Sequence, residues 1–269
     1  MELISSRSNK FIKYLKSLTL ARNRHKEGLF LIEGVRIIEE AIERKGCIEK
    51  LIVTPLGYNN DRVKALVDSA SGRGMETMWV ADRVIDYISE TKANQGIMAL
   101  VRPEEYAEKD LENGSIPIIV VAHLLQAPGN IGTIVRVAEA AGAGGVVITP
   151  GTVDFFNPKA LRATMGSIFR LPTVRVASLE GFVDTFKKKG YQVVAAMVSA
   201  KTHYFNLDYS KPTILLIGQE GAGLTPEAIE LTDGQISIPM ATMIDSLNVA
   251  SAASVILFEA VRQKMTSNR

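Results

Sequence analysis

Residues Ile214 to Leu224, ILLIGQEGAGL, decide the fold together with residues Ile236 to Val261, ISIPMATMIDSLNVASAASVILFEAV. Each stretch begins with a short apolar run, typical of a buried strand, and continues into a loop. Ser246, Leu247 and Asn248 then open a predicted final helix, where polar side chains meet free backbone N–H groups. The two segments are suited to hold a flat, polar cofactor.

Working outward, further apolar runs predict a mostly parallel sheet that is covered on both faces by helices. Such sheets bind ligands beyond the carboxyl ends of their strands. The predicted strands are Ile118 to Ala122, Val146 to Thr149, Gln192 to Ala196, Ile214 to Ile217 and Ile236 to Ile238.

The first loop of this sheet leads into QAPGNIGTIVRVAEAAG, residues Gln126 to Gly142. Asn130 can cap a helix here, and Gly142 is placed to end it. Arg136 lies opposite the apolar stripe of that helix, a position where an arginine is usually just solvated. A second segment, NPKALRATMGSIFRLP, offers Arg162 and Arg170, which could bind phosphate or could equally be structural.

The first hundred residues alternate predicted strands and helices, which indicates a smaller α/β/α layer domain at residues 1–103. The segment RPEEYAEKDLENGSIP is polar, acidic and interrupted by prolines and a glycine, so it predicts a linker at residues 104–116. The second domain then covers residues 117–269.

Basic residues concentrate in the first domain, although the whole chain has a formal charge of only +2. Up to Arg102 there are 17 Lys and Arg against 13 Asp and Glu, and after it 14 against 16. The excess gathers at the start and is typical of a protein that binds a phosphate backbone, although a charge run can also be a solvated helix face. These early cations are Arg7, Lys10, Lys13, Lys16, Arg22, Arg24 and Lys26.

Several classes of protein are disfavoured. The amino-terminal segment has no apolar core of signal-peptide type, and no long apolar run follows, so we expect a cytoplasmic protein without a membrane span. One cysteine and three scattered histidines predict no metal site. Gly218, Gly221 and Gly223 do not have the dinucleotide-binding spacing, and no G-x-S-x-G motif supports Ser246 as a hydrolase nucleophile.

Three motifs together resemble the SpoU (TrmH-like) family of RNA ribose 2′-O-methyltransferases over nearly the whole chain. They are PGNIGTIVRVAEAAG, LLIGQEGAGL and SIPMATMIDSLNVASAASVILFEAV. The amino-terminal SSRSNKFIKYLKSL and GLFLIEGVRIIEEAI are similar to the accessory RNA-binding domain of that family, which is a weaker signal.

The resemblance implies S-adenosylmethionine as cofactor, RNA as substrate, a homodimer and a carboxyl-terminal trefoil knot. It assigns catalytic positions to Asn130, Arg136, Glu220, Ser246 and Asn248, and cofactor contacts to Gly218, Ile238, Met240 and Leu247. It also favours RNA contacts by Arg7, Lys10, Lys13, Arg22, Arg24 and Arg162. Ribosomal RNA of the large subunit (23S) is the first expectation and transfer RNA the second.

A guanidinium stays protonated in proteins, so we expect Arg136 to clamp a phosphate and stabilise the developing alkoxide, with Glu220 orienting it. Ala127 stands where the family usually has Asp or Asn. This difference bears on which substrate is recognised more than on which reaction is catalysed. Taken singly, Asn130 and Asn248 could be only helix caps. A non-catalytic RNA-binding or ribosome-assembly protein, or an enzyme that methylates a base nitrogen, are the alternatives.

Overall fold

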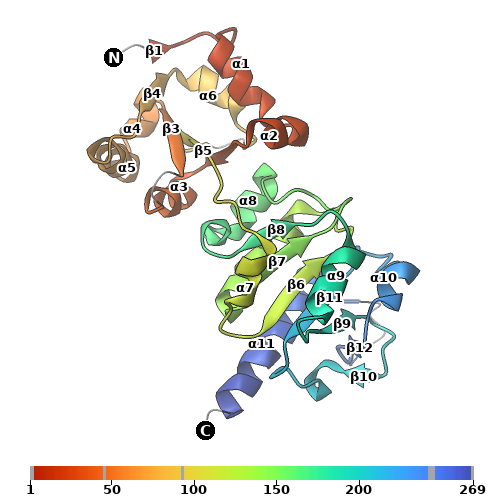
Figure 1. The fold of residues 1–269 in the computed structure, drawn as a ribbon. Helices are drawn as coiled ribbons and strands as arrows, with labels where there is room; N and C mark the ends of the chain where they lie inside the picture. The colour runs from red at the N-terminus through yellow and green to blue at the C-terminus, as the bar shows by residue number, and fades with distance from the viewer. Residues whose placement is uncertain (1–2, 45–46, 92–93, 242–245, 268–269) are drawn as a thin grey trace. The chain divides into compact units, whose positions relative to one another are not determined.

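A computed structural model describes residues 3–44, 47–91, 94–241 and 246–267. The chain forms two compact units, each of which has its own sheet (Figure 1). Unit 1 consists of Met1–Glu105 and Phe156–Phe169, and unit 2 of Tyr106–Phe155 and Arg170–Arg269. The polypeptide therefore leaves unit 2 after Phe155 and returns to it at Arg170.

Unit 1 contains a five-stranded mixed sheet in the order β1-β4-β3-β5-β2. Strands β1, β4 and β3 are parallel, whereas β5 runs antiparallel to both β3 and β2. The strands are β1 (Leu3–Ile4), β2 (Phe30–Glu33), β3 (Ile48–Val53), β4 (Thr77–Val80) and β5 (Ile97–Val101). The helices are α1 (Lys10–Ser17), α2 (Ala21–Glu27), α3 (Val35–Ile42), α4 (Pro55–Tyr58), α5 (Asp61–Gly72) and α6 (Asp82–Ile88).

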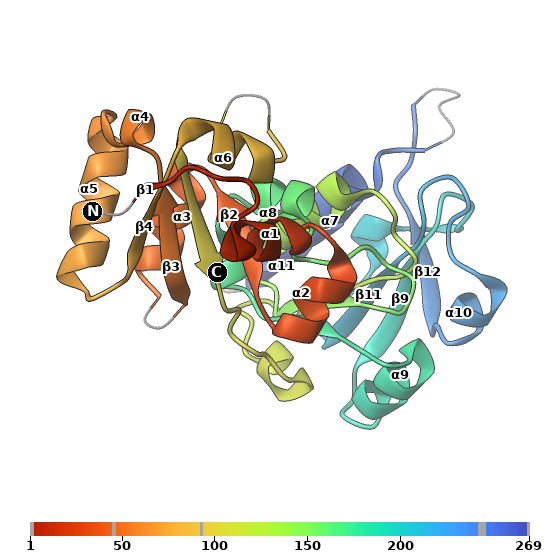
Figure 2. The ribbon, with the colours of Figure 1, turned by 90° about the horizontal axis from the view of Figure 1, so that it is seen from above.

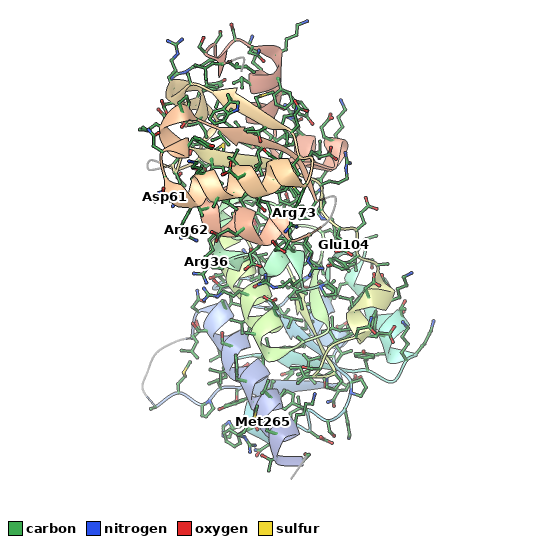
Figure 3. All side chains as sticks on the ribbon, turned by 90° about the vertical axis from the view of Figure 1, so that its left-hand side faces the viewer. Arg36, Asp61, Arg62, Arg73, Glu104 and Met265 are labelled. Carbon is green, nitrogen blue, oxygen red and sulfur yellow. The ribbon has the colours of Figure 1, made fainter. Side chains whose placement is uncertain are left out.

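Helices cover both faces of this sheet, as an α/β/α layer domain requires (Figures 1 and 2). Helices α1 and α6 lie side by side and bury Ile12, Leu15 and Ile85 against one face. Helices α3 and α5 pack together on the other face. Figure 3 shows α5 from the side, with Asp61 and Arg62 at its start and Arg73 just after its end.

The excursion from unit 2 completes unit 1. Its helix α8 (Pro158–Thr164) packs on β2, and the Phe156 ring stacks on Phe30 with centroids 4.5 Å apart. The 3-10 helix η2 (Ser167–Phe169) ends the excursion. Gly166 at φ +94° passes so close to the Glu40 side chain that an added Cβ would lie 2.5 Å from it.

Unit 2 contains seven parallel strands in the order β10-β12-β9-β11-β6-β7-β8, which confirms the predicted parallel sheet. The strands are β6 (Ile118–Ala122), β7 (Gly145–Ile148), β8 (Thr173–Arg175), β9 (Gln192–Ala196), β10 (Thr202–His203), β11 (Thr213–Ile217) and β12 (Gly234–Ser237). Between and after them lie η1 (Glu108–Glu112), α7 (Pro128–Ala141), α9 (Leu179–Lys187), η3 (Tyr204–Asn206), α10 (Pro226–Glu230) and α11 (Val249–Ser267).

The central strands of unit 2 are buried on both faces, because every side chain of β6 and β11 is at most 1% exposed. One face packs against Phe182, Phe186 and Ala228 of α9 and α10. Helices α7 and α11 pack closely on each other (Figure 1). The resulting core fixes the carboxyl ends of β6 and β11 side by side, since these strands are hydrogen-bonded neighbours.

The segment predicted as a linker is structured after residue 105. It forms η1, and Leu111 is 1% exposed within the core of unit 2. The predicted knot stays a prediction, because residues 242–245, between β12 and α11, lie outside the described part of the chain. Among the residues that the structure describes, none of the helices is long and apolar enough to cross a membrane.

Candidate functional site

Three segments meet at the carboxyl edge of the unit 2 sheet. The loop after β6 brings Gln126, the first turn of α7 brings Asn130, the loop after β11 brings Glu220, and the residue before α11 is Asn248. Neighbouring parallel strands end at the same edge, so β6 and β11 place their following loops in contact. Three stretches that are far apart in the sequence therefore build one site.

A chain of amide hydrogen bonds joins these segments. Asn248 Nδ2 donates to Asn130 Oδ1 at 3.0 Å, and Asn130 Nδ2 donates to Glu220 Oε1 at 2.8 Å. Asn248 Oδ1 accepts from the backbone N–H groups of Ala250 and Ser251, so Asn248 also caps α11. A carboxylate only accepts and a backbone N–H only donates, so the two ends of the chain determine which way both amides face.

Asn130 is not a helix cap, contrary to one reading of its position in the sequence. Helix α7 begins at Pro128 with Ala127 as its N-cap, and Ala127 has no side chain that could cap it. Proline favours the first turn because its fixed φ suits a helix and it has no N–H to satisfy. The helix starts early enough for Asn130 to lie within its first turn, and its side chain reaches Glu220 instead. The predicted end at Gly142 is confirmed by an αL conformation there.

Glu220 lies at the tip of a tight loop. Gln219 and Gly223 pair through two backbone hydrogen bonds of 2.9 and 2.8 Å, which closes the loop behind it. The loop is narrow at its base, where a Cβ added to Gly218 would lie 2.4 Å from the Gly223 backbone. Only glycine fits at position 218 without opening this loop.

Glu220 is held as a carboxylate. Partial burial raises its pKa, but hydrogen bonds from the Asn130 side chain and from the backbones of Glu220, Gln126 and Ala127 outweigh this and hold the pKa below its usual value. The Gln126 N–H donates to Glu220 Oε2 at 3.3 Å. A carboxylate that is engaged by several donors is a weak base, so Glu220 is suited to anchoring and not to proton removal.

Gln126 is a site residue that the sequence alone did not reveal. Its Nε2 donates to the backbone oxygens of Leu124 and Gly151, at 2.9 and 2.6 Å. Leu124 has φ +59°, a conformation that non-glycine residues seldom adopt, and its N–H donates to Thr152 Oγ1 at 2.9 Å. The loop that presents Gln126 and Ala127 to Glu220 is thus fixed in a strained conformation. Residue patterns give no sign of such strain.

Arg136 lies apart from the amide chain. It follows Asn130 by six residues on α7, so the two side chains leave the helix about 120° apart. Its side chain is exposed, and within the described ranges no hydrogen bond or ion pair of its guanidinium is found. The expectation that Glu220 orients Arg136 is therefore replaced by the observed contact of Glu220 with Asn130.

The residues expected to contact a cofactor lie directly after β11, directly after β12 and just before α11. Gly218 follows β11, Ile238 and Met240 follow β12 and are half-buried, and Leu247 is 38% exposed. Ser246 is exposed, two residues before Asn248. Half-exposed apolar groups and a narrow glycine loop suit the flat, largely apolar faces of an adenosine, so the chemistry of these residues fits S-adenosylmethionine.

The predicted RNA-contacting cations are distributed unequally. Arg7, Lys10, Lys13 and Arg22 are exposed on unit 1. Arg24 is only 4% exposed, and its Nη1 donates to the backbone oxygens of Leu18 and Thr19, so it stabilises the turn between α1 and α2. Arg162 is half-buried on α8, and Arg170 pairs with Glu139 on α7.

No group of three or more His, Cys, Asp or Glu that could hold a metal ion occurs in the described residues. That no metal takes part stays a prediction.

Two family models together match most of the chain. Residues 117–258 match the family model of the SpoU rRNA Methylase family, and residues 9–99 match the MRM3-like substrate binding domain.

Similar relatives include a 23S rRNA (guanosine(2553)-2′-O)-methyltransferase, RlmP, from Bacillus subtilis, with 31% identity over 96% of this chain and 98% of that protein. A 23S rRNA (uridine(2479)-2′-O)-methyltransferase from Streptomyces viridochromogenes is 34% identical over 98% of this chain and 93% of its own. The solved structure of an AdoMet-bound rRNA methyltransferase from Sinorhizobium meliloti matches with a TM-score of 0.85 and 31% identity, covering 97% and 98% of the two chains.

Proposed function

The chain belongs to the SpoU rRNA methylase family, and we propose that it transfers a methyl group from S-adenosylmethionine to a ribose 2′-hydroxyl of 23S rRNA. The observation that carries the proposal is the hydrogen-bonded chain from Asn248 through Asn130 to Glu220, because it joins one residue from each of three sequence motifs. A protein that merely retained the fold would not need these three polar groups to meet at one sheet edge.

S-Adenosylmethionine supplies a methyl group that its sulfonium already activates, so the protein has to position the 2′-oxygen and help it lose a proton. Asn130 uses one of its two Nδ2 hydrogens on Glu220 and keeps the other for a ribose oxygen. Gly218, Ile238, Met240 and Leu247 would hold the cofactor, and Ser246 would contact its methionine end or the ribose.

Arg136 provides the positive charge in this proposal. Its guanidinium binds a phosphate of the RNA bidentately and stabilises the negative charge that develops on the 2′-oxygen. The proton passes to water, since a guanidinium is no base in a protein and Glu220 has a lowered pKa. The exposure of Arg136 supports this role, because a solvent-facing guanidinium is accessible to an RNA strand.

We propose ribosomal RNA as the substrate because the relatives named above act on 23S rRNA. Transfer RNA is the second candidate. Residues 1–103 would form the RNA-binding domain and residues 117–269 the catalytic domain, which fits the match of the first part to a substrate-binding domain. We further propose a homodimer that acts in the cytoplasm.

The deciding experiment incubates the purified protein with methyl-labelled S-adenosylmethionine and unmodified 23S rRNA or tRNA transcripts, followed by nucleoside analysis. We expect label as a 2′-O-methylnucleoside in 23S rRNA and a clearly lower rate of labelling with an Asn130→Ala, Glu220→Gln double variant. Label on a base would contradict ribose chemistry. Label only in tRNA would contradict the proposed substrate. Full activity of the double variant would contradict the assignment of Asn130 and Glu220 to the active site.

A further inference from the structure

One row of cations on unit 1 is spaced regularly. Arg7, Lys10, Lys13 and Lys16 follow one another at intervals of three residues, the last three on α1. Residues three apart on a helix lie on neighbouring positions of one side, so Lys10, Lys13 and Lys16 form a row beside the buried Ile12 and Leu15. Arg7 precedes the helix and joins the row through its contacts with α6. Arg83 on α6 adds a fifth cation, because α6 lies next to α1 (Figures 1 and 2). We call these five residues the α1–α6 cationic row.

Tyr87 of α6 holds two members of the row in place. Its ring lies beneath the Arg7 guanidinium and the Lys16 ammonium, each 5.6 Å from the ring centroid. Lys16 Nζ also donates to the Ile88 carbonyl at 3.5 Å. Such cation–π contacts restrict flexible side chains that would otherwise lose conformational freedom when a ligand binds.

Backbone carbonyls fix the two arginines. Arg7 Nε donates to the Arg83 carbonyl at 3.2 Å, and Arg83 Nε donates to the Ser5 carbonyl at 2.9 Å. Both contacts use the inner nitrogen, Nε, of the guanidinium. The outer nitrogens keep donors for an anion, since a guanidinium carries five N–H groups in all.

The row also differs from the opposite face of unit 1 in its charge balance. There, Arg62 pairs with Glu39 at 2.8 Å and Arg73 with Glu43 at 2.9 Å, where Figure 3 labels both arginines. Within the ranges that the structure describes, no carboxylate forms an ion pair with a member of the row. Helix α1 contains no acidic residue, and α6 contributes Asp82 and Asp86 against five cations.

We propose that the α1–α6 cationic row binds the phosphodiester backbone of an RNA strand, with Tyr87 as the residue that positions Arg7 and Lys16. Cations that are already fixed and have no carboxylate partner suit a phosphate backbone. Ordering their side chains on binding costs little conformational entropy, and the phosphates supply the negative charge that would neutralise them. The inference rests on the proposed function, since it assigns a surface of unit 1 to the RNA substrate. It adds Arg83 and Tyr87 to the residues considered above, and it places Lys16, one of the early cations, within the row.

The test compares RNA binding by full-length variants over a range of salt concentrations, with unmodified 23S rRNA transcript as the probe. Lys10→Ala, Lys13→Ala removes two exposed cations, and Tyr87→Ala removes the positioning ring. Tyr87→Phe keeps an aromatic ring under both cations and serves as the conservative variant. Arg62→Ala, Arg73→Ala removes as much charge from the opposite face and is the matched control.

We expect Lys10→Ala, Lys13→Ala to weaken binding about tenfold and to lower the slope of log affinity against log salt by about 2. Tyr87→Ala should weaken binding about threefold, whereas Tyr87→Phe and the Arg62, Arg73 control should stay near wild type. Unchanged affinity and slope in the double lysine variant would overturn the row as a phosphate surface. An equal loss in Tyr87→Ala and Tyr87→Phe would overturn the role of the ring.

Two further readouts separate this inference from the proposed function. Thermal melting shows whether Tyr87→Ala is folded, and the exposed lysines keep the test decisive if it is not. Methylation by the wild type tests the reaction itself. A wild type that methylates RNA, with row variants that bind and react normally, would refute only the row. A wild type that never methylates RNA would refute the reaction, while the salt slopes still report on the row.

Discussion

Asn130 and Glu220 are 90 positions apart in the chain, yet Asn130 Nδ2 donates a hydrogen bond of 2.8 Å to Glu220 Oε1. The contact exists because β6 and β11 are neighbours in the sheet and their following loops meet. Asn248 extends it from the start of α11. Catalysis should therefore depend on the three hydrogen-bonded side chains acting as a unit.

Asn130→Ala and Glu220→Gln should each lower kcat/KM by about tenfold or more. The first removes the partner of both Glu220 and Asn248, and the second removes the charge and one of the two acceptor oxygens that Asn130 and the Gln126 N–H use. The double variant should lose less than the product of the two, with a coupling free energy of roughly 1–2 kcal/mol. Single-turnover methylation of the RNA substrate measures this. Effects that multiply independently would contradict a shared role.

Arg136→Ala should lower kcat by about 10²–10³-fold, because a donor aimed at developing charge stabilises the transition state more than the ground state. Affinity for S-adenosylmethionine, measured by calorimetry, should stay within about twofold, since Arg136 is not among the proposed cofactor contacts. Arg136→Lys should recover only part of the rate, because an ammonium cannot bind phosphate bidentately. Lys188→Ala, on an exposed cation of the same unit, is the control, and a comparable loss there would contradict a specific role.

Glu220 should stabilise the fold at neutral pH and lose that contribution in acid. Its pKa in the folded protein lies below the ordinary value of 4.5, so the contribution is complete above the unfolded pKa and declines as the pH falls through the folded one. Wild type should therefore exceed Glu220→Gln in free energy of unfolding at about pH 7, and the difference should shrink as the pH falls below about 4. Urea unfolding of both proteins at about pH 7 and below about pH 4 measures this difference. A difference independent of pH would contradict the assignment.

Gly218→Ala should destabilise the loop that presents Glu220, because its Cβ would lie 2.4 Å from the Gly223 backbone. Overpacking against backbone costs about 1–3 kcal/mol, and the displaced loop should also weaken cofactor binding. Thermal melting and calorimetry with S-adenosylmethionine measure the two effects. Gly129→Ala is the control for stability, since its Cβ would meet nothing within 4 Å, and an equal drop in melting temperature there would refute the steric explanation.

Most of the regular structure could be predicted from residue patterns. Most strands of the larger sheet were found because they are short apolar runs between helices, and β6 and β9 begin and end at the predicted residues. Strand β8 was not predicted. Helix α2, with the sequence ARNRHKE, was missed because it has no apolar periodicity. Strands β1 and β10 are two residues long, which is too short for any pattern.

The site was predicted as a set of positions but not as a set of contacts. Asn130, Glu220 and Asn248 were named, and they do meet. Their mutual partners could not be foreseen, and Glu220 was expected to face Arg136. Arg24 shows the same limit, because a basic residue in a basic run proved to be buried against the carbonyls of Leu18 and Thr19.

The order of amino acids alone is therefore enough to specify the family, the parallel sheet and the positions that carry polar chemistry, because hydrophobic periodicity and short motifs are local properties. Only the folded chain decided that Gln126 and a strained Leu124 support Glu220, that Asn130 bonds a carboxylate and not its own helix, and that Tyr87 holds Arg7. Each of these contacts joins groups brought together by strand order or helix packing. Hydrogen-bond and cation–π partners are chosen by distances of a few ångströms, which the order of residues does not encode locally.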